Sequence, residues 1–224
     1  TMPEMPEVQG LVSFLGARVV GLAVVSVEVG SIAVLKTYDP APQSLAGAPV
    51  DSVSRHGKFL DLDCDGIHLV FHLAKAGWLR WYDATPATLV RPGKSPIALR
   101  VRLSDGSGFD LTEAGTKKSL AAYIVGDVTA VPRIVSLGPD PLGEDFTLEV
   151  FSQIAASHRM QVKGMLRDQS IIAGVGNAYS DEVLHVAKLS PFALATNLSP
   201  DEVERLYEAL RGTLADRRTS KFLK

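Results

Sequence analysis

The chain is poor in cysteine, in long apolar stretches and in net charge. Cys64 is the one cysteine among 224 residues, which excludes an internal disulfide framework. Because Cys64 falls in an alternating strand pattern, we expect it to be a small buried hydrophobic residue. No apolar run is long enough to span a bilayer and no signal peptide is visible, so we expect a soluble, cytoplasmic protein without membrane contact.

The sequence also lacks the excess of basic residues that nucleic-acid-binding proteins usually show. Its 23 Lys and Arg stand against 25 Asp and Glu, which gives a net charge of −2. Residues 1–150 hold 13 basic against 17 acidic residues, whereas residues 151–224 hold 10 against 8. The acidic excess therefore lies in the first part of the chain. A local basic patch is compatible with the net charge of −2.

Hydrophobic periodicity predicts an all-β pattern in the first part, after a short amphipathic helix at residues 8–16. Residues 105–108 (DGSG) predict a hairpin turn. Alternating and β-branched segments predict strands at residues 19–29, 59–62, 68–73, 78–82 and 97–103. These segments indicate a β-sandwich or barrel with a flanking helix.

The periodicity becomes helical after a proline-rich segment at residues 132–141. Ser199, followed by Pro200 and two acidic residues, is a strong helix start signal. Helical spacing is found at residues 147–157, 162–167, 181–187 and 199–214. We therefore expect an α+β protein of two domains, with a β-sandwich in residues 1–131, a linker in 132–146 and a helical domain in 147–224.

The first four residues, Thr1-Met2-Pro3-Glu4, suggest a catalytic amine. If Met2 is an initiator that is removed, Pro3 becomes the first residue and carries a secondary amine. Terminal amines titrate near pH ~7.7–8.0, so a fraction is neutral and nucleophilic at physiological pH. Such an amine can attack a sugar C1′ atom, and the adjacent carboxylate can transfer protons. Most acidic residues after a terminal proline are only solvated, so these residues alone do not favour catalysis.

A glycine-rich turn at residues 174–177 (GVGN) separates two helical patterns. Its glycines permit positive φ and a close approach of the backbone to a partner. Asn177 stands at the start of the next helix, where it can act as the N-cap. The free backbone N–H groups of Gly176 and its neighbours, together with the helix dipole, favour a phosphate. The spacing is not that of a dinucleotide-binding fingerprint.

Four segments, in this order along the chain, resemble motifs of the formamidopyrimidine-DNA glycosylase and endonuclease VIII family. Residues 3–8 (PEMPEV) resemble its N-terminal catalytic motif, and residues 55–60 (RHGKFL) resemble its loop with a lysine close to the lesion. Residues 137–142 (LGPDPL) resemble its interdomain linker. Residues 168–179 (DQSIIAGVGNAY) resemble its helix-two-turn-helix signature.

The resemblance implies a bifunctional DNA glycosylase and abasic-site lyase of base-excision repair. Such an enzyme acts as a monomer on double-stranded DNA that carries a damaged base or an abasic site, and it works inside the cell on the nucleoid. It flips the damaged nucleotide out of the stack, removes an oxidised base and cleaves the strand by β- and δ-elimination. The family does not reveal which oxidised base this chain prefers.

The resemblance also assigns roles to individual residues. Pro3 would form the Schiff base and Glu4 would be the general acid and base. Glu7 would orient the N-terminus, unless its role is only structural. Lys58 would contact the phosphate beside the lesion or assist β-elimination, unless it is an exposed lysine without a role. Lys163, Gly176 and Asn177 would contact phosphates, which positions the protein without reading sequence. For Asn177, helix capping is the alternative. His72, in an apolar strand, is expected to be a core histidine.

The chain departs from the family pattern at two loops. Lys75 stands where the family has a methionine that fills the gap left by the flipped nucleotide. The lysine stem can still insert, but its ammonium group must be desolvated. In residues 112–119, Lys117 or Lys118 would replace an arginine that faces the opposite base, and no phenylalanine is present. Lysine lacks the planar fork of arginine, so we expect altered opposite-base selectivity, unless this loop is only solvated.

The two ends of the chain raise further expectations. The family often ends in a four-cysteine zinc finger, and no cysteine follows Cys64. The junction at residues 213–216 is abrupt, so we expect zinc only if a finger is missing from the sequence there, and otherwise no metal or cofactor. Thr1 is interpreted as an addition. With Thr1 and Met2 attached, the Pro3 nitrogen is an amide and the protein is expected to be inert.

Two alternatives to the enzyme remain at this point. A catalytically impaired paralogue that binds damaged DNA without excision would explain the departures at Lys75 and residues 112–119. An RNA-binding or purely structural protein has no specific sequence feature in its favour.

Overall fold

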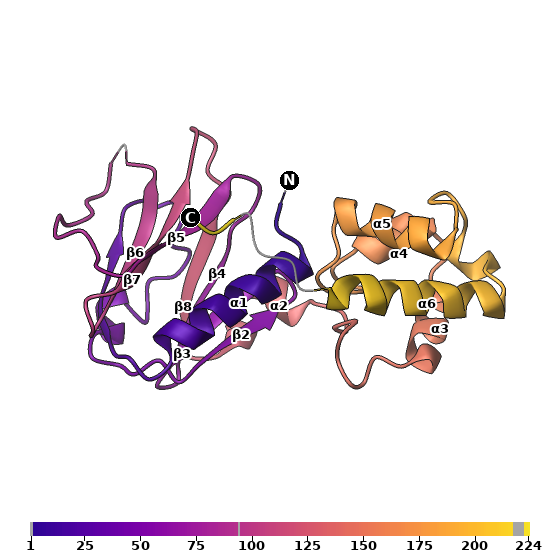
Figure 1. Cartoon of the computed structure of the whole chain (residues 1–224), viewed down its shortest axis with the longest axis horizontal. Helices are drawn as coiled ribbons and strands as arrows, with labels where there is room; N and C mark the ends of the chain where they lie inside the picture. Colours follow the sequence, from indigo (N-terminus) through magenta and orange to yellow (C-terminus); the bar gives the residue numbers. More distant parts are fainter. Residues whose placement is uncertain (1, 94, 217–221) are drawn as a thin grey trace.

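The computed structural model describes residues 2–93, 95–216 and 222–224. Figure 1 shows an elongated molecule with a β-rich part at one end and a helical part at the other. We call the elements from α1 to β8 the sheet unit and the elements from α3 to α6 the helical unit. The α+β architecture expected from the sequence is confirmed.

The sheet unit consists of two antiparallel sheets of four strands each. The first has the order β1-β6-β7-β5, and the second has the order β2-β3-β4-β8. Leu62, Phe71, Leu99 and Phe109 are among the fully buried side chains of the core that the strands share. The strands are β1 (Val24–Val29), β2 (Ser52–His56), β3 (Phe59–Cys64), β4 (Ile67–His72), β5 (Gly77–Tyr82), β6 (Ile97–Leu103), β7 (Gly108–Glu113) and β8 (Ala121–Val125). The predicted hairpin turn joins β6 to β7.

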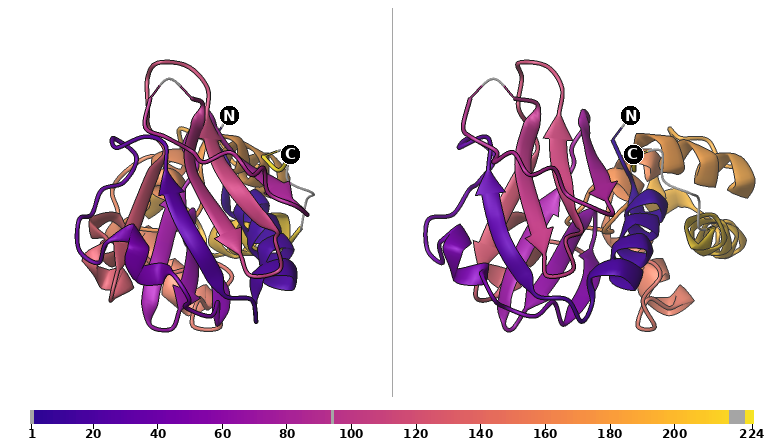
Figure 2. Two further views of the ribbon diagram at one scale, coloured as in Figure 1. Left: turned by 90° about the vertical axis from the view of Figure 1, so that its left-hand side faces the viewer. Right: turned by 60° about the vertical axis from the view of Figure 1, so that its left-hand side comes forward.

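Helix α1 (Met5–Val19) lies between the sheets and the helical unit (Figure 2). It begins earlier than predicted because Pro6 falls in its first turn and Glu4 and Glu7 form a capping box. It also ends later, at Val19, so the predicted strand at residues 19–29 is wrong in its first five residues. Apolar helix faces and strands both contain β-branched residues, which explains the error.

The helical unit packs around a separate hydrophobic core. Phe151, Met165, Val183 and Leu206 are fully buried in it. Its helices are α3 (Leu148–Ser157), α4 (Val162–Arg167), α5 (Asn177–Ala187) and α6 (Pro200–Ala215). The start signal at Ser199 is confirmed, because its side chain accepts the N–H of Glu202.

Short helical segments occupy several connections. The proline-rich segment expected as a linker contains one helical turn, α2 (Pro132–Val135). The 3-10 turns are η1 (Pro42–Leu45), η2 (Val128–Ala130) and η3 (Ala195–Asn197). In the described part of the chain, no helix is long and apolar enough to cross a membrane.

Met5 joins the two units, and an ion pair of β2 fixes the connection between them. Met5, the first residue of α1, is fully buried in the core of the helical unit. Its backbone N–H donates to the carbonyl oxygen of Gly174 at 2.9 Å. Arg55 of β2 forms a 2.7 Å ion pair with Asp140 of the connection between the units. The N-terminal segment is therefore fixed against both units.

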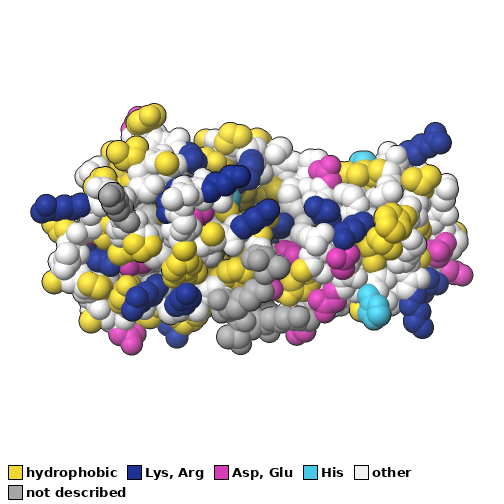
Figure 3. Space-filling view, turned by 90° about the horizontal axis from the view of Figure 1, so that it is seen from above, with side chains coloured by type: hydrophobic (Ala, Val, Ile, Leu, Met, Phe, Trp, Pro, Cys, Tyr) yellow, Lys and Arg dark blue, Asp and Glu magenta, His cyan; other side chains and the backbone are white. Residues whose placement is uncertain are grey.

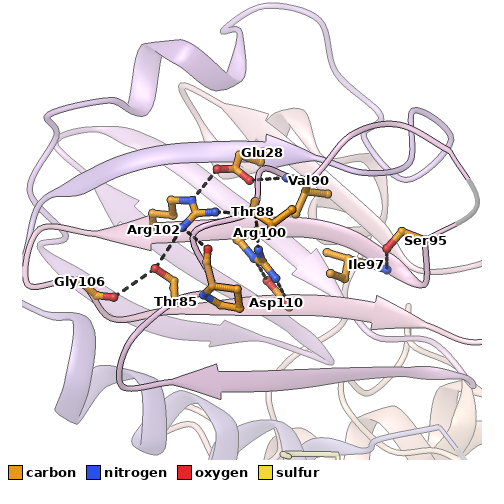
Figure 4. Close-up of polar contacts among 11 residues, drawn as sticks. Glu28, Thr85, Thr88, Val90, Ser95, Ile97, Arg100, Arg102, Gly106 and Asp110 are labelled. Carbon is orange, nitrogen blue, oxygen red and sulfur yellow. Dashed lines mark hydrogen bonds and ion pairs between the residues drawn. The ribbon is translucent and has the colours of Figure 1, made fainter.

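A charged network lies on the outer face of the first sheet (Figure 4). Arg100 forms two hydrogen bonds of 2.6 and 2.8 Å with Asp110, and Arg102 forms one of 2.6 Å with Glu28. Both arginines also donate to the carbonyl oxygen of Thr88. The network holds the loop between β5 and β6 against the sheet, so we interpret it as structural. Elsewhere in the sheet unit, Cys64 is 1% exposed, as expected.

Candidate active site

A cavity of about 550 Å³ opens where the two units meet. Four segments contribute to it: the start of the chain, the β2–β3 turn, the β4–β5 turn and the connection from α4 to α5. It is lined by Met2, Glu4, Lys58, Lys75, Arg167, Gln169, Gly176, Asn177 and Ala178. Seen from above, Lys and Arg side chains gather around this junction (Figure 3). Five residues singled out from the sequence thus meet in one cleft.

The carboxylate of Glu4 lies at the N-terminus of α5. Its Oε1 atom accepts the backbone N–H of Gly176 at 2.5 Å, and its Oε2 atom accepts that of Ala178 at 3.0 Å. The N–H of Tyr179 lies 3.2 Å from Oε1. A carboxylate at this end of a helix is stabilised by the unpaired N–H groups and by the dipole.

This arrangement corrects two sequence-based expectations about the glycine-rich turn. The N–H groups of Gly176 and Ala178, expected to be free for a phosphate, are occupied by Glu4 of the same chain. The N-cap is Gly176, whereas Asn177 is the first helical residue, so the expected capping by Asn177 is wrong. The Asn177 side chain is exposed and lines the cleft.

A side chain at either glycine of the turn would collide with the N-terminal segment. A Cβ atom at Gly176 would lie 2.7 Å from Cδ of Glu4, and one at Gly174 would lie 2.4 Å from Cε of Met5. Gly174 also has a φ of +93°, which other residues rarely adopt. The turn therefore brings its backbone directly against the N-terminal segment.

Glu7 supports Glu4 from the first turn of α1. Its Oε2 atom accepts the backbone N–H of Glu4 at 3.0 Å. The hydroxyl of Tyr179 donates to the other oxygen, Oε1, at 3.1 Å. Glu7 thus contacts the backbone beside Pro3 and a side chain of α5.

Burial shifts the pKa values of Glu4 and Lys58 in opposite directions. It raises the pKa of Glu4, although the N–H groups of Gly176, Tyr179 and Ala178 and the charge of Lys58 act against it. Burial lowers the pKa of Lys58, Arg167 lowers it further, and Glu4 opposes both effects. Both shifts move the pKa of the group towards neutral pH, where proton transfer is needed.

Met2, which is bonded to the nitrogen of the candidate nucleophile Pro3, lines the cleft. Pro3 is buried, and Met2 lines this cavity and a smaller one of about 210 Å³ beside it. Removal of Met2 would therefore convert the Pro3 nitrogen into an amine and also open space at that atom. The interpretation of Thr1 as an addition concerns a residue outside those the structure describes.

The smaller cavity contains His72 and Arg133. His72 is 8% exposed, its ring stands nearly perpendicular to that of Phe59, and its Nε2 atom faces Nη2 of Arg133. Burial lowers the pKa of His72 to about 4, and the charges of Arg133, Lys36 and Lys58 act in the same direction. The imidazole is therefore neutral at pH 7 and accepts a hydrogen bond from Arg133, as expected of a satisfied core histidine.

Gln169 and Arg167 were not predicted as site residues. The Gln169 side chain donates to the carbonyl oxygens of Val175 (2.7 Å) and Arg167 (3.0 Å), and its Oε1 atom accepts the N–H of Gly174 at 2.9 Å. It thus braces the glycine-rich turn from inside. Gln169 belongs to residues 168–179, which resemble the helix-two-turn-helix signature. This resemblance was the one sequence signal that could have identified it as a site residue. Nothing in the local pattern of the sequence marks Arg167.

The remaining predicted contacts lie outside the two cavities. Lys163 forms a 2.6 Å ion pair with Asp181 across α4 and α5. Lys118 donates to the carbonyl oxygen of Glu113 at 2.8 Å, and Lys117 is exposed on the same loop. That loop is organised by the fully buried carboxylate of Glu113, which accepts the N–H of Leu120 at 2.9 Å.

The described residues contain no group of three or more His, Cys, Asp or Glu side chains that could hold a metal ion. They therefore do not fit the zinc finger that the family often has. Part of the tail on which the expectation of a missing finger rests, residues 217–221, lies outside the described chain.

Sequence comparisons find related proteins over nearly the whole chain. Residues 2–119 match the model of the formamidopyrimidine-DNA glycosylase N-terminal domain, and residues 137–217 match that of the formamidopyrimidine-DNA glycosylase H2TH domain. The formamidopyrimidine-DNA glycosylases of Symbiobacterium thermophilum and Heliobacterium modesticaldum are each 33% identical to the chain. The matches cover 95% and 96% of this chain and 69% and 78% of those proteins.

Solved structures show the same relationship. The MutM (Fpg) protein of Thermus thermophilus is similar with a TM-score of 0.80 and 31% identity, over 96% of this chain and 75% of that one. The Lactococcus lactis formamidopyrimidine-DNA glycosylase bound non-covalently to abasic-site DNA is similar with a TM-score of 0.82 and 26% identity. That match covers 96% of this chain and 81% of the other.

Proposed function

Because the chain belongs to the formamidopyrimidine-DNA glycosylase family, we propose that it excises an oxidised base from double-stranded DNA in the cleft between its two units and then cleaves the strand. The observation that carries this proposal is the position of Glu4, next to Pro3, with its carboxylate held by the glycine-rich turn of the helical unit. The proposal includes the division into domains at residues 131 and 147.

The first step requires Pro3 as the N-terminal residue. The lone pair of its amine attacks C1′ of the flipped nucleotide, and the bond from C1′ to the base breaks with its electrons leaving on the base. The proline nitrogen, now positively charged, gives its proton to the departing base. Glu4 donates a proton to the sugar ring oxygen, and the nitrogen lone pair then breaks the bond from C1′ to that oxygen, which opens the ring and leaves an iminium between Pro3 and C1′. The raised pKa of Glu4 suits this role, since a general acid is more effective when its pKa lies closer to the operating pH.

Strand cleavage follows from the iminium. Loss of a proton from C2′ expels the 3′ phosphate by β-elimination, because the positive nitrogen accepts the electron pair. Lys58 supports this step as a base or as a phosphate contact, since burial lowers its pKa and it lines both cavities. Hydrolysis of the iminium then releases the sugar fragment from Pro3.

Cations around the cleft supply the grip on DNA. Lys58 and Arg167 line the cavity on its two sides, and Asn177 is exposed beside them. Contacts of this kind to phosphates hold the duplex without reading its sequence, and they weaken as salt increases. The net charge of −2 is compatible with this grip, because the grip depends on the cations that line the cleft and not on the charge of the whole chain.

The proposal is tested by base release under single-turnover conditions. The chain beginning at Pro3 is mixed with duplexes that carry an oxidised purine, an oxidised pyrimidine or no lesion, and free base and strand breaks are measured. We expect release from at least one lesion duplex and none from the undamaged duplex. Salt-dependent binding to lesion duplexes without any release would instead support the catalytically impaired paralogue.

A further inference from the structure

The edge of β5 is paired with a short segment from much later in the chain. Residues Phe222–Lys224 run parallel to β5, with Leu223 opposite Leu79. The N–H of Leu79 donates to the oxygen of Phe222 (2.8 Å), and the N–H of Lys224 donates to the oxygen of Leu79 (2.9 Å). The N–H of Trp81 donates to the oxygen of Lys224 at 3.0 Å. The segment thus extends the sheet beyond β5, which is otherwise its last strand.

Side chains reinforce this pairing. Phe222 is 8% exposed and belongs to the hydrophobic core of the sheet unit, against which Leu223 also packs. The Nζ atom of Lys224 lies 4.3 Å from the centroid of the Trp78 ring, which is a cation–π distance. Each of the three side chains therefore contacts the sheet unit: Phe222 and Leu223 contact its core, and Lys224 contacts the Trp78 ring.

Residues Phe222–Lys224 lie on a different unit from α6, the helix that precedes them in the sequence. Helix α6 ends at Ala215 in the helical unit, whereas Phe222 is buried in the sheet unit. Figure 1 shows the end of the chain beside β5, away from the helices. The described end of the chain therefore lies on the sheet unit, whereas the last helix before it belongs to the helical unit.

We propose that the edge of β5 is a strand-addition site for an extended Phe-Leu-Lys segment, and that residues 222–224 occupy it in solution. In strand addition, backbone hydrogen bonds provide affinity and side-chain pockets provide specificity. An edge strand left unpaired is also a template for pairing with other chains, which the segment prevents here. The proposal is independent of the chemistry in the cleft.

Amide hydrogen exchange tests the proposal with a matched pair of variants. Phe222→Ala removes the anchor, and Phe192→Ala removes a phenylalanine that is 73% exposed. In Phe222→Ala we expect exchange at Leu79 and Trp81 to accelerate roughly tenfold or more, because both amides lose their acceptors. The amides of Trp78 and Arg80 face β7 by strand alternation and should stay protected. Phe192→Ala should leave all four unchanged.

A second pair of variants leaves the core untouched. Lys224→Pro deletes the N–H that donates to Leu79, whereas Lys224→Ala keeps it and removes only the cation. We expect faster exchange at Leu79 and Trp81 in the proline variant than in the alanine variant. If Phe222→Ala unfolds the whole sheet, the two Lys224 variants still show whether residues 222–224 protect the edge of β5. Unchanged exchange at Leu79 and Trp81 in Lys224→Pro would overturn the proposal.

Discussion

The carboxylate of Glu4 accepts a hydrogen bond from the backbone N–H of Gly176, a residue 172 positions later in the chain. The contact joins a candidate catalytic group of the sheet unit to the first turn of α5 in the helical unit. Its consequence is that the position of Glu4 depends on the correct packing of both units. Small changes in the glycine-rich turn should therefore act on catalysis before they act on folding.

Gly176→Ala tests this dependence. The added Cβ atom would lie 2.7 Å from Cδ and 2.9 Å from Oε1 of Glu4, so the carboxyl group must move. We expect base release to fall by about two orders of magnitude, the lower end of what general acid–base groups contribute. The measurement is single-turnover kinetics beside a thermal unfolding curve.

Gly212→Ala is the matched control for that substitution. Gly212 lies in α6, and a Cβ atom there has no neighbour within 4 Å among the described residues. The substitution should stabilise the helix by roughly 0.5–1 kcal/mol and leave the rate unchanged. Equal rates for Gly176→Ala and Gly212→Ala would show that the close approach to Glu4 has no catalytic role.

Gln169→Glu tests the brace beneath the turn. The glutamate carboxylate has the same size and still accepts the N–H of Gly174. It cannot donate to the carbonyl oxygens of Val175 and Arg167, so its negative charge faces both oxygens without a hydrogen bond. We expect kcat to fall at least tenfold with a smaller change in KM, since the turn positions Glu4. Gln153→Glu, on the exposed side of α3, should change neither constant. A change confined to KM would assign Gln169 to DNA binding.

Lys75→Met tests the role of the β4–β5 turn. Lys75 is exposed at the cleft and follows Ala74, which has a φ of +54°. If the side chain fills the gap left by a flipped nucleotide, methionine should increase affinity for an abasic duplex, because no ammonium group is desolvated. Lower affinity together with a salt dependence reduced by about one ion would instead identify Lys75 as a phosphate contact.

His72 should make stability depend on pH. Burial lowers its pKa in the folded protein to about 4, below the ordinary value of 6.5. Between these values the unfolded chain binds a proton that the folded chain does not. The contribution of His72 to the free energy of unfolding should therefore be constant above pH 6.5 and fall as the pH decreases towards 4, by roughly 3 kcal/mol at most.

Denaturant unfolding of two histidine variants checks this dependence. His72→Gln should remove much of the loss between pH 6.5 and 4, because glutamine does not titrate. His185→Gln, which replaces an exposed histidine of α5, should retain the loss. An identical pH dependence in both variants would contradict the assignment to His72.

The sequence predicted the architecture well and the site only in part. Alternation identified most strands, and the start signal at Ser199 was confirmed, because these patterns are local. Glu4 and Gly176 were both selected, but their hydrogen bond spans most of the chain and has no local signature. Asn177 was misplaced as the cap because the actual partner of the helix N-terminus comes from the residue before α1.

Other features depend on tertiary packing in the same way. The brace formed by Gln169 requires three backbone groups that only the folded turn brings together. The pairing of Phe222–Lys224 with β5 has no counterpart in periodicity, because three residues are too few to show one.

Borohydride trapping on abasic duplex DNA tests the central claim most directly. Two chains are compared that differ by one residue, one beginning at Pro3 and one retaining Met2, and Glu4→Gln is examined in the chain beginning at Pro3. The account predicts a covalent adduct with the Pro3 chain and none with the Met2 chain, whose proline nitrogen is an amide. An adduct of equal yield with the Met2 chain, or no adduct from a Pro3 chain that binds the duplex, would contradict it.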